Sequence, residues 1–424
     1  MRILQIVHQY LPEHVGGTEL YTRWLAQGLQ EQGHTVAVFT RRERAGQGWE
    51  MQTVEQVSVY AAWAGEMTPT QRYLATFRNG ALVDAFGQIL DDFQADLVHV
   101  QHLMGLPAAI LDVVQARGIP YIVTLHDYWW ICANANLLTN YSDETCAGPV
   151  AYLNCTHCIV ARSAQNASWL GAPVITGSLI WRARLLRKIL QGAQQVIAFS
   201  EFVRTWYGQQ GMAAAKLCLL APGVEQPPAD LPTRHRLPEQ PVRLLYLGGI
   251  ARVKGVHVIL EALRHVPGAV ELWVAGDLTS DPAYSDELRQ LATTKVTFLG
   301  RLDRQAVWQR LAQVDVLLAP SLWHETYCFV AREAFAAGVP VIASRMGALS
   351  ELVRHEIDGL LVSPGDPQAW QAALQSVVDD PQRLERWRTA IRQPAHRQEH
   401  IAQMIDLYTG VVKGYLSHRL VTDG

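Results

Sequence analysis

Short apolar segments alternate with longer segments of helical pattern along almost the whole chain, and this alternation limits its fold more than any other feature. The expected strands span residues 3–7, 35–40, 97–100, 121–125 and 196–199 in the first half, and 243–247, 271–275, 296–299, 316–319, 340–343 and 360–362 in the second. Residues 18–32 and 256–266 between them are expected to form helices, closed by Gly33 and Gly268. Apolar strands separated by helices indicate an α/β fold with parallel sheets covered on both faces.

A proline-rich break divides this pattern into two halves. Residues 225–241 hold five prolines in seventeen positions, which is typical of a stiff linker. The 424 residues are enough for two domains of about 200 residues each. We therefore expect doubly wound domains over residues 1–225 and 241–395, facing each other across a cleft, and a last helix over residues 400–424 that could pack back on the first domain. Ligands of such sheets bind beyond the carboxyl ends of the strands.

Charge and hydropathy argue against two classes of partner. The formal net charge of −3 gives no general attraction for nucleic acid, and no apolar run reaches the 18 residues of a membrane-spanning helix. The first seven residues resemble the start of a signal peptide, but Gln5, His8 and Gln9 interrupt the apolar core and no small-x-small cleavage site follows. A buried first strand is the better interpretation, and we expect a cytoplasmic protein with reduced thiols.

Two glutamates, Glu325 and Glu333, give the strongest indication of chemistry. Glu325 lies in a polar turn after Pro320-Ser321, and Glu333 lies in a short apolar run that is expected to form a helix ending at Gly338. A helix N-terminus offers free N–H groups and partial positive charge that suit a phosphate, and carboxylates beside it are good acceptors for sugar hydroxyls. The pattern therefore favours a ligand that is both sugar and phosphate.

Two glycine-containing turns, one after the first strand of each half, could hold the phosphates. Gly16 and Gly17 let the backbone approach a diphosphate, although an ordinary strand-to-helix turn is the alternative. Gly249 precedes Arg252 and Lys254, which offer a planar fork and a point charge to a pyrophosphate; two solvated charges in a loop are the alternative. The first turn is not Gly-x-Gly-x-x-Gly, so a nicotinamide cofactor is poorly supported.

A histidine, His126, stands at the carboxyl end of the strand expected over residues 121–125. A side chain at this end of a parallel strand faces the ligand cleft. A lone histidine is more often a satisfied core residue, but the position of His126 favours a place in the site.

Taken in order, these motifs resemble those of glycosyltransferase family four, whose members are retaining enzymes that use nucleotide sugars and have the GT-B fold of two facing Rossmann-like domains. The matching segments are residues 16–19, 124–127, 200–202, 222–225, 248–255, 298–302, 320–333, 338–343 and 358–362. The resemblance covers nearly the whole chain, and its most specific parts are the paired glutamates and their order with the Arg252 and Lys254 loop.

The resemblance implies a role for each matching residue. Arg252 and Lys254 would bind the diphosphate, and His126 would contact the donor sugar near the reacting carbon. Glu325 would hydrogen-bond the donor sugar, and Glu333 would bind the ribose hydroxyls. The other donor-binding residues would be Gly16, Gly17, Gly249, Arg301, Leu302, Tyr327, Cys328, Phe329 and Val330. The family usually has Phe-Gly where this chain has Tyr327-Cys328, so its preference for the donor sugar could differ.

The resemblance also implies a reaction. A sugar would pass, with retention of configuration, from a UDP- or GDP-linked donor to a saccharide or glycolipid acceptor in bacterial polysaccharide or glycoconjugate synthesis. The sequence has no Asp-x-Asp to hold a divalent ion on the diphosphate, so we expect no catalytic cofactor. A nucleotide-sugar epimerase of the same architecture is the alternative enzyme. A binding protein with a degenerate site is disfavoured because the set of charged residues is complete.

Four of the six cysteines, Cys132, Cys146, Cys155 and Cys158, lie within 27 residues. Four thiols in a cytoplasmic insertion, here about residues 127–170, fit a closed structural zinc site. The spacing before Cys155 is irregular for a zinc ribbon, and reduced thiols packed as small hydrophobes are an equally weighted alternative.

Residues 181–188 mix cations with apolar anchors at helical spacing, in the sequence Trp-Arg-Ala-Arg-Leu-Leu-Arg-Lys. Such a stripe could rest on the inner face of an anionic membrane or hold a lipid-phosphate acceptor. A solvated helix face is the better interpretation.

Overall fold

A computed structural model describes residues 1–162, 171–232, 237 and 239–422 of the protein. The chain forms two compact units. The first contains Met1–Ala221 and Gln398–Gly424, and the second contains Pro222–Arg397. Parts of the expected insertion (163–170), the expected linker (233–236 and 238) and the end of the expected last helix (423–424) lie outside the described residues.

The first unit is built on an eight-stranded sheet with the order β3-β4-β2-β1-β5-β6-β7-β8. All neighbouring strands are parallel except β3 and β4, which are antiparallel. The five strands expected in the first half are all present, and β3, β4 and β8 were not expected. The strands are β1 (Arg2–Ile6), β2 (Thr35–Arg42), β3 (Trp49–Val54), β4 (Val57–Trp63), β5 (Leu97–Val100), β6 (Tyr121–Leu125), β7 (Gln195–Ala198) and β8 (Leu217–Leu219).

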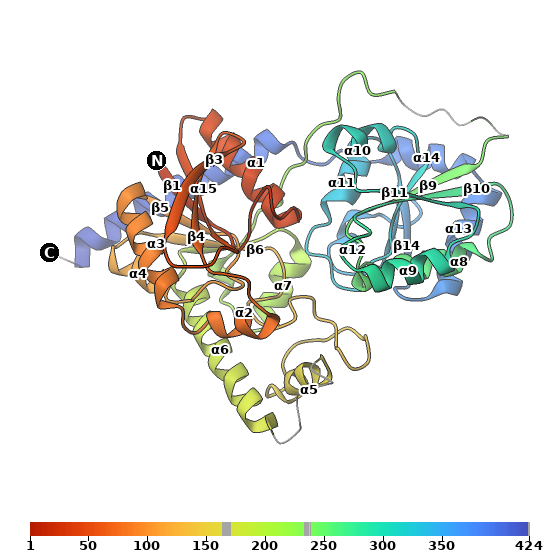
Figure 1. The fold of residues 1–424 in the computed structure, drawn as a ribbon. Helices are drawn as coiled ribbons and strands as arrows, with labels where there is room; N and C mark the ends of the chain where they lie inside the picture. Colours follow the sequence, from red (N-terminus) through yellow and green to blue (C-terminus); the bar gives the residue numbers. More distant parts are fainter. Residues whose placement is uncertain (163–170, 233–236, 238, 423–424) are drawn as a thin grey trace. The chain divides into compact units, whose positions relative to one another are not determined.

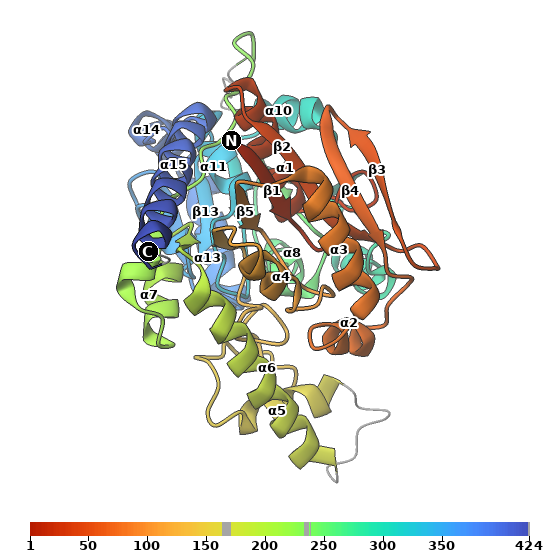
Figure 2. The ribbon, with the colours of Figure 1, turned by 90° about the vertical axis from the view of Figure 1, so that its left-hand side faces the viewer.

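Helices connect these strands and cover the sheet. They are α1 (Gly17–Glu31), α2 (Pro69–Ala75), α3 (Gly80–Phe93), α4 (Ile110–Ala116), α5 (Leu153–Arg162), α6 (Ala172–Gly192), α7 (Glu201–Gln209) and α15 (Arg397–Thr422). Figure 2 shows α5 packed beside α6 at the end of this unit that lies farthest from β3.

The last helix, α15, packs on the first unit. A Cβ at Gly28 of α1 would lie 2.5 Å from Cδ1 of Ile401, so the two helices approach closely. The hydroxyl of Tyr408 lies 2.7 Å from Nδ1 of His99 in β5. Figure 1 shows α15 beside β1 and α1.

The second unit is built on a six-stranded, fully parallel sheet with the order β11-β10-β9-β12-β13-β14. All six strands expected in the second half are present. They are β9 (Val242–Leu247), β10 (Val270–Ala275), β11 (Val296–Gly300), β12 (Val316–Ala319), β13 (Val341–Ser344) and β14 (Gly359–Val362).

Helices cover both faces of this second sheet. They are α8 (Val256–Leu263), α9 (Pro282–Leu291), α10 (Arg304–Leu311), α11 (Phe329–Ala336), α12 (Leu349–Leu352), α13 (Pro367–Asp379) and α14 (Gln382–Ala390). Successive residues of β9 point to opposite faces, so Leu244 packs in one apolar core with α8 and α13, and Leu245 packs in another with α10 and α11. The expected doubly wound architecture is confirmed for both halves.

No helix in the described ranges combines the length and the apolar character that crossing a membrane needs.

Candidate active site

The centre of the candidate site in the second unit is an ion pair between Lys254 and Glu325. Lys254 Nζ lies 2.7 Å from Glu325 Oε1, and the same oxygen accepts hydrogen bonds from Ser321 Oγ at 2.6 Å and Trp323 Nε1 at 2.9 Å. Glu325 is only 5% exposed, so this carboxylate is stabilised by three donors instead of water. Its other oxygen, Oε2, has no hydrogen-bond partner in the described part of the chain.

Close backbone packing fixes this pair. Leu322 N donates to Val253 O at 2.8 Å, which joins the loop of Lys254 to the loop of Glu325. On the other side, Gly347 has a φ of +51° and a Cβ there would lie 2.5 Å from Glu325 O. Only glycine suits both the left-handed backbone and this contact, so the loop that carries Glu325 is packed from two sides.

The second predicted cation, Arg252, points elsewhere. Its guanidinium pairs with Glu287 of α9 and lies 5.4 Å from the ring centre of Tyr284. About half of the Arg252 side chain is exposed, so this ion pair is a weak one. The structure thus brings Lys254 to Glu325 but leaves Arg252 on a neighbouring carboxylate.

Helix α11 begins directly after this centre, at a residue with an unusual backbone. Cys328, the N-cap, has φ +61° and ψ +76°, which is the left-handed region that favours glycine. Burial and the charge of Glu325 raise the pKa of the Cys328 thiol to about 12. Phe329 and Val330 form the first turn of α11, and the partial positive charge at this end of a helix suits an anion.

Tyr327 anchors the start of the same helix. Its hydroxyl donates to Pro222 O, and its ring packs edge-on against Phe329 at 4.9 Å between centres. The guanidinium of Arg332 lies 3.9 Å from the centre of the Tyr327 ring. Burial raises the pKa of Tyr327 to about 12, so the phenol remains a neutral donor at physiological pH.

Glu333 lies one turn further along α11 and is paired with Arg304 of α10. Arg304 Nη1 lies 2.7 Å from Glu333 Oε1, while Arg304 Nε donates to Glu225 at 2.8 Å. Burial raises the pKa of Glu333, and the Arg304 charge opposes that rise. Arg304 was not among the predicted site residues, although it follows the predicted Arg301 by three positions and Leu302 by two.

Gly249, Arg301 and Leu302 lie in loops at the carboxyl ends of β9 and β11. Gly249 is exposed and accepts a 2.7 Å hydrogen bond from the Tyr246 hydroxyl through its carbonyl. Arg301 is exposed, and its charge contributes to the lowered pKa of Asp277, which hydrogen bonds from Thr279 lower most. Leu302 packs on the apolar core between the sheet and α10.

In the first unit, His126 is part of a buried chain of polar side chains. His126 Nε2 lies 2.7 Å from Gln101 Oε1, and Gln101 Nε2 donates to Gln5 Oε1 at 2.7 Å. Gln5 Nε2 in turn donates to Thr22 O at 3.3 Å. Because the Gln101 oxygen can only accept, Nε2 of His126 carries the proton.

Burial lowers the pKa of His126 to about 3, with a contribution from the neighbouring His102. The imidazole therefore remains neutral at physiological pH. His102 lies 3.1 Å from Asp127 through its own Nε2. Neither Gln101 nor His102 was predicted, because the apolar strand pattern gives no signal for polar side chains that face one another across strand ends.

Gly16 and Gly17 open α1 as expected. Gly16 is the N-cap in an extended conformation, and a Cβ at this position would lie 2.7 Å from Glu19 Oε2. Glu19 is 2% exposed and lies in the first turn of α1, where the helix dipole favours an acid. Gly16 therefore allows the carboxylate of Glu19 to lie against the backbone of this turn.

The four predicted metal ligands all line one small hollow in the insertion. As their side chains stand, no group of three His, Cys, Asp or Glu residues in the described ranges is gathered closely enough to hold a metal ion. The six cysteines are free thiols.

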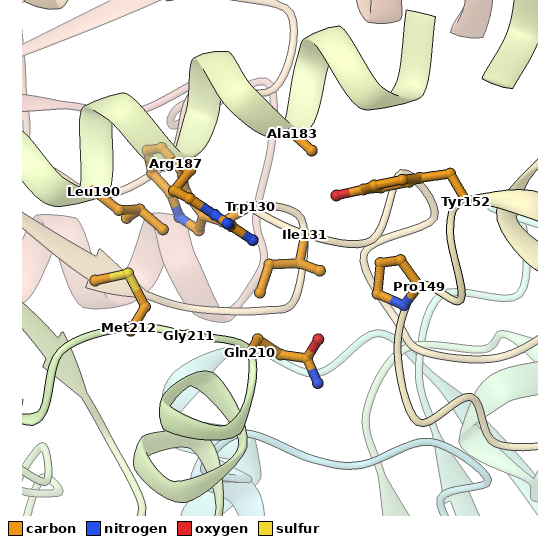
Figure 3. Close-up of a pocket in the computed structure, with 10 residues that line it drawn as sticks. All are labelled: Trp130, Ile131, Pro149, Tyr152, Ala183, Arg187, Leu190, Gln210, Gly211 and Met212. Atoms are coloured by element: carbon orange, nitrogen blue, oxygen red, sulfur yellow. The ribbon is translucent and has the colours of Figure 1, made fainter. Parts of the chain in front are cut away.

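A larger pocket lies beside the insertion, also within the first unit, and has a volume of about 180 Å³. Figure 3 shows Arg187 reaching into it from α6 and Tyr152 from the opposite wall. Trp130 lines it as well, is 1% exposed, and has no hydrogen-bond partner for Nε1 among the described residues. The lining is completed by Ile131, Pro149, Ala183, Leu190, Gln210, Gly211 and Met212.

The basic stripe of residues 181–188 is divided between surface and core. Arg182 is 2% exposed, and its Nη2 donates to Trp129 O at 2.5 Å. Lys188 pairs with Asp112 at 3.3 Å, and the exposed Trp181 stacks on Phe77 at 4.4 Å. Arg182 is therefore not part of a cationic surface.

Comparisons with known proteins connect both halves of the chain to glycosyltransferases. Residues 16–223 match the family model "Glycosyl transferase 4-like domain", and residues 229–393 match "Glycosyl transferases group 1". Glycogen synthase from Mycobacterium tuberculosis is 27% identical over 401 residues, which cover 93% of this chain and 90% of that protein.

Solved structures share the fold. Sucrose-phosphate synthase from Thermosynechococcus elongatus has a TM-score of 0.73 at 22% identity, over 97% of this chain and 99% of that chain. HepE from Anabaena, in complex with UDP and glucose, has a TM-score of 0.67 at 17% identity, over 97% of this chain and 100% of that chain.

Proposed function

We propose that this chain, which belongs to glycosyltransferase family four, transfers a hexose from a UDP- or GDP-linked donor to a saccharide or glycolipid acceptor with retention of configuration. That it is a glycosyltransferase follows from its family, and the epimerase alternative finds no support in the matching proteins. The HepE complex with UDP and glucose makes UDP-glucose the first donor to test.

The observation that supports this proposal best is the convergence of three donors on one oxygen of Glu325. Lys254, Ser321 and Trp323 hold Oε1, so the buried carboxylate is oriented before any ligand arrives. Its other oxygen, Oε2, is then positioned to accept a hydrogen bond from a hydroxyl of the donor sugar. Such preorganisation favours the transition state because no group must reorient as charge develops.

The leaving nucleoside diphosphate needs positive charge. Lys254 is next to Glu325, and the N-terminus of α11 adds the partial positive charge of its helix dipole at the same place. Arg252 would join them by leaving Glu287, which is an exposed partner. In the proposed mechanism, these groups stabilise the negative charge of the leaving diphosphate, and no catalytic metal is needed.

Glu333 would hold the ribose. In the structure it is paired with Arg304 and largely buried, so nucleotide binding would replace or extend that pair. His126 would contact the donor sugar as a neutral imidazole, because its pKa of about 3 excludes a charged role at physiological pH. In this picture neither glutamate is a nucleophile, and both position the donor.

We place the acceptor in the pocket of Figure 3. Saccharides bind where an aromatic surface lies beside a few hydrogen-bonding groups, and this pocket combines the half-buried Tyr152 with Arg187 and Gln210. Arg187 would attract an acceptor that carries phosphate or carboxylate. Residues Arg184 and Arg187 on the same helix could also draw the protein to the inner face of an anionic membrane.

Two variants test the assignment of donor roles. Glu325→Ala should leave the affinity for free UDP within about twofold but reduce transfer from UDP-glucose by roughly 10²-fold or more, because UDP lacks the sugar that Glu325 binds. Glu333→Ala should weaken the binding of UDP itself, by roughly tenfold for one lost charged hydrogen bond. Calorimetric titration with UDP and GDP, and transfer assays with UDP-glucose and GDP-mannose, would separate the two roles.

The exposed cation Arg289 on α9 provides a matched control, since within the described ranges its ion pair is with its neighbour Asp286 alone. Arg289→Ala should leave both measurements unchanged. Normal turnover by purified, folded Glu325→Ala would refute the role of Glu325. Incubation of each sugar nucleotide without acceptor should return it unchanged, whereas an epimerase would convert it.

A further inference from the structure

Four cysteine side chains of the insertion surround a single hollow of about 30 Å³. Cys155 and Cys158 are three residues apart on α5 and so lie on the same face of that helix. Cys132 and Cys146 reach the hollow from the loops before α5. The chain therefore brings together thiols that are widely spaced in sequence, and does so without a disulfide among them.

The sulfur of Cys158 is surrounded by hydrogen-bond donors. Asn134 Nδ2 donates to Cys158 Sγ at 3.0 Å, and Asn140 N donates to it at 3.2 Å. A neutral thiol is a weak acceptor, whereas a metal-bound thiolate carries negative charge and needs such donors. Two N–H groups directed at one sulfur are thus what the outer shell of a thiolate ligand requires.

Cys146 shows the same arrangement. Its Sγ accepts from Gly148 N at 3.4 Å and from Asn154 Nδ2 at 3.6 Å. The donor Gly148 follows the cysteine by two residues in a turn and has a φ of +126°, so the backbone N–H of the turn points back at the sulfur.

A buried cation lies close to the cysteines without a carboxylate partner. Arg182 is 2% exposed, and it forms no ion pair with any Asp or Glu in the described ranges. It lies near enough to Cys132 and Cys155 for their charges to interact. Burying a guanidinium without a direct ion pair is costly, and thiolates in this hollow would add to the negative charge that Asp127 already provides nearby.

Part of the insertion packs poorly, although Tyr128, Trp130 and Leu137 near its start are buried. Tyr141, Val150 and Leu153 are exposed apolar side chains in this segment, and small segments with poor cores usually need a disulfide or a metal. Left-handed backbone conformations, which persist only where the surroundings enforce them, occur at five non-glycine residues between Cys132 and Cys158. They are Ala135, Leu137, Asp143, Ala151 and Tyr152.

We propose that Cys132, Cys146, Cys155 and Cys158 bind one structural zinc ion. Each thiol releases its proton to solvent as its sulfur bonds the metal, so that four thiols and one Zn²⁺ give one tetrathiolate site with a net charge of −2 and four protons. The sulfurs lie around the hollow without meeting at one point, so binding requires the cysteine side chains to turn inward until each sulfur reaches the Zn–S distance of about 2.3 Å. Four thiolates leave no open position, so the ion has no part in catalysis.

The site would also fix the wall of the larger pocket. Pro149 and Tyr152 lie between Cys146 and Cys155 in sequence, and both line the pocket of Figure 3. Zinc would therefore hold the segment that presents these two residues. The effect on acceptor binding rests on the proposed function of this pocket. The metal site is argued independently of that proposal.

Metal analysis of the purified full-length protein tests the proposal directly. We expect about one zinc per chain in the wild type, and a thiolate-to-cobalt charge-transfer band with tetrahedral d–d absorption after substitution with Co²⁺. Cys155→Ser should lose most of the metal and the charge-transfer intensity. The matched control is Cys218→Ser, which alters a cysteine of β8 outside the hollow and should retain full metal content.

Two outcomes would overturn the proposal. One is wild-type protein that contains no metal, takes up no Co²⁺ after reduction, and keeps the same unfolding midpoint in the presence of a chelator. The other is non-reducing peptide mapping that finds the four residues paired as disulfides. Because the readouts are metal content and spectra, failure here would leave the transferase assignment untouched, and failure of transfer assays would leave the metal site untouched.

Discussion

Gly255 lies against the backbone of Pro320 so closely that a Cβ at position 255 would stand 2.0 Å from the Pro320 carbonyl oxygen. Gly255 also has a φ of +72°, a conformation that other residues adopt only with strain. The contact connects two loops, because Lys254 precedes the glycine and Glu325 follows the proline by five residues. The spacing of the Lys254 and Glu325 ion pair therefore depends on a residue that has no side chain.

Gly255→Ala should consequently impair transfer without altering any charged group. We expect a loss of about 1–3 kcal/mol of stability from strain and overlap, together with a fall of tenfold or more in kcat as Lys254 moves away from Glu325. Urea unfolding and a transfer assay would measure both. Gly410→Ala, in a helix with open space around it, is the control that should retain activity; equal activity in both variants would contradict the coupling.

Glu287 should compete with the donor for Arg252. Removing its charge with Glu287→Gln frees the guanidinium, and because exposed ion pairs contribute about 0.2–1 kcal/mol, UDP affinity should rise by roughly 1.5- to 5-fold. Titration calorimetry at low salt would detect the change. Arg252→Ala should move the affinity in the opposite direction. If neither variant changes UDP binding, Arg252 does not reach the diphosphate.

The protein should be more stable with glycine than with alanine at position 328. Both substitutions remove the thiol, but only glycine accepts the φ of +61° without strain, so Cys328→Gly should exceed Cys328→Ala by about 1 kcal/mol in urea unfolding. Equal stabilities would show that the left-handed cap is not strained. Since burial raises the pKa of this thiol to about 12, iodoacetamide at pH 8 should leave Cys328 unmodified in the folded protein.

Buried histidines in the first unit should make the protein sensitive to acid. Burial lowers the pKa of His99 to about 3 and that of His400 to about 4, whereas an unfolded histidine titrates near pH 6.5. Between these values only the unfolded chain binds the proton. The free energy of unfolding should therefore fall as pH decreases from 6.5 towards 4, by about 1.4 kcal/mol per pH unit for each histidine.

Replacing one of these histidines tests the origin of that slope. His400→Gln should reduce the slope of the free energy of unfolding against pH by the contribution of one histidine. Urea unfolding between pH 4.5 and 7 would measure it. The exposed His265 provides the control, and His265→Gln should keep the wild-type slope. Identical slopes in the wild type and His400→Gln would mean that burial of His400 does not drive the acid response.

Much of the architecture could be predicted because parallel strands buried on both faces give continuous apolar runs. The hairpin of β3 and β4 was not predicted, and the same physical reason explains this. Its outer strand alternates, with Met51 and Thr53 exposed between half-buried neighbours, and this pattern of a one-sided edge differs from the runs that define the rest of the sheet.

The candidate site was predictable in its residue types but not in its pairings. Glu325 and Lys254 meet as the motifs suggested, whereas Arg252 pairs with Glu287 and Glu333 with Arg304. Long side chains choose among several nearby partners, and sequence spacing does not rank those choices. Gln5 was read only as an interruption of an apolar segment, yet in the fold it is one end of the polar chain that reaches His126.

The return of α15 to the first unit has a practical consequence for dissecting this protein. A fragment that ends in the proline-rich segment would lack Tyr408, the partner of His99, and His400, the partner of Tyr21. Two buried hydrogen bonds would be lost, and the surface of α1 around Gly28 that Ile401 covers would be exposed to water. The amino-terminal half should therefore be insoluble when expressed alone, and it should be rescued when residues 398–424 are supplied as a separate peptide or joined by a short tether.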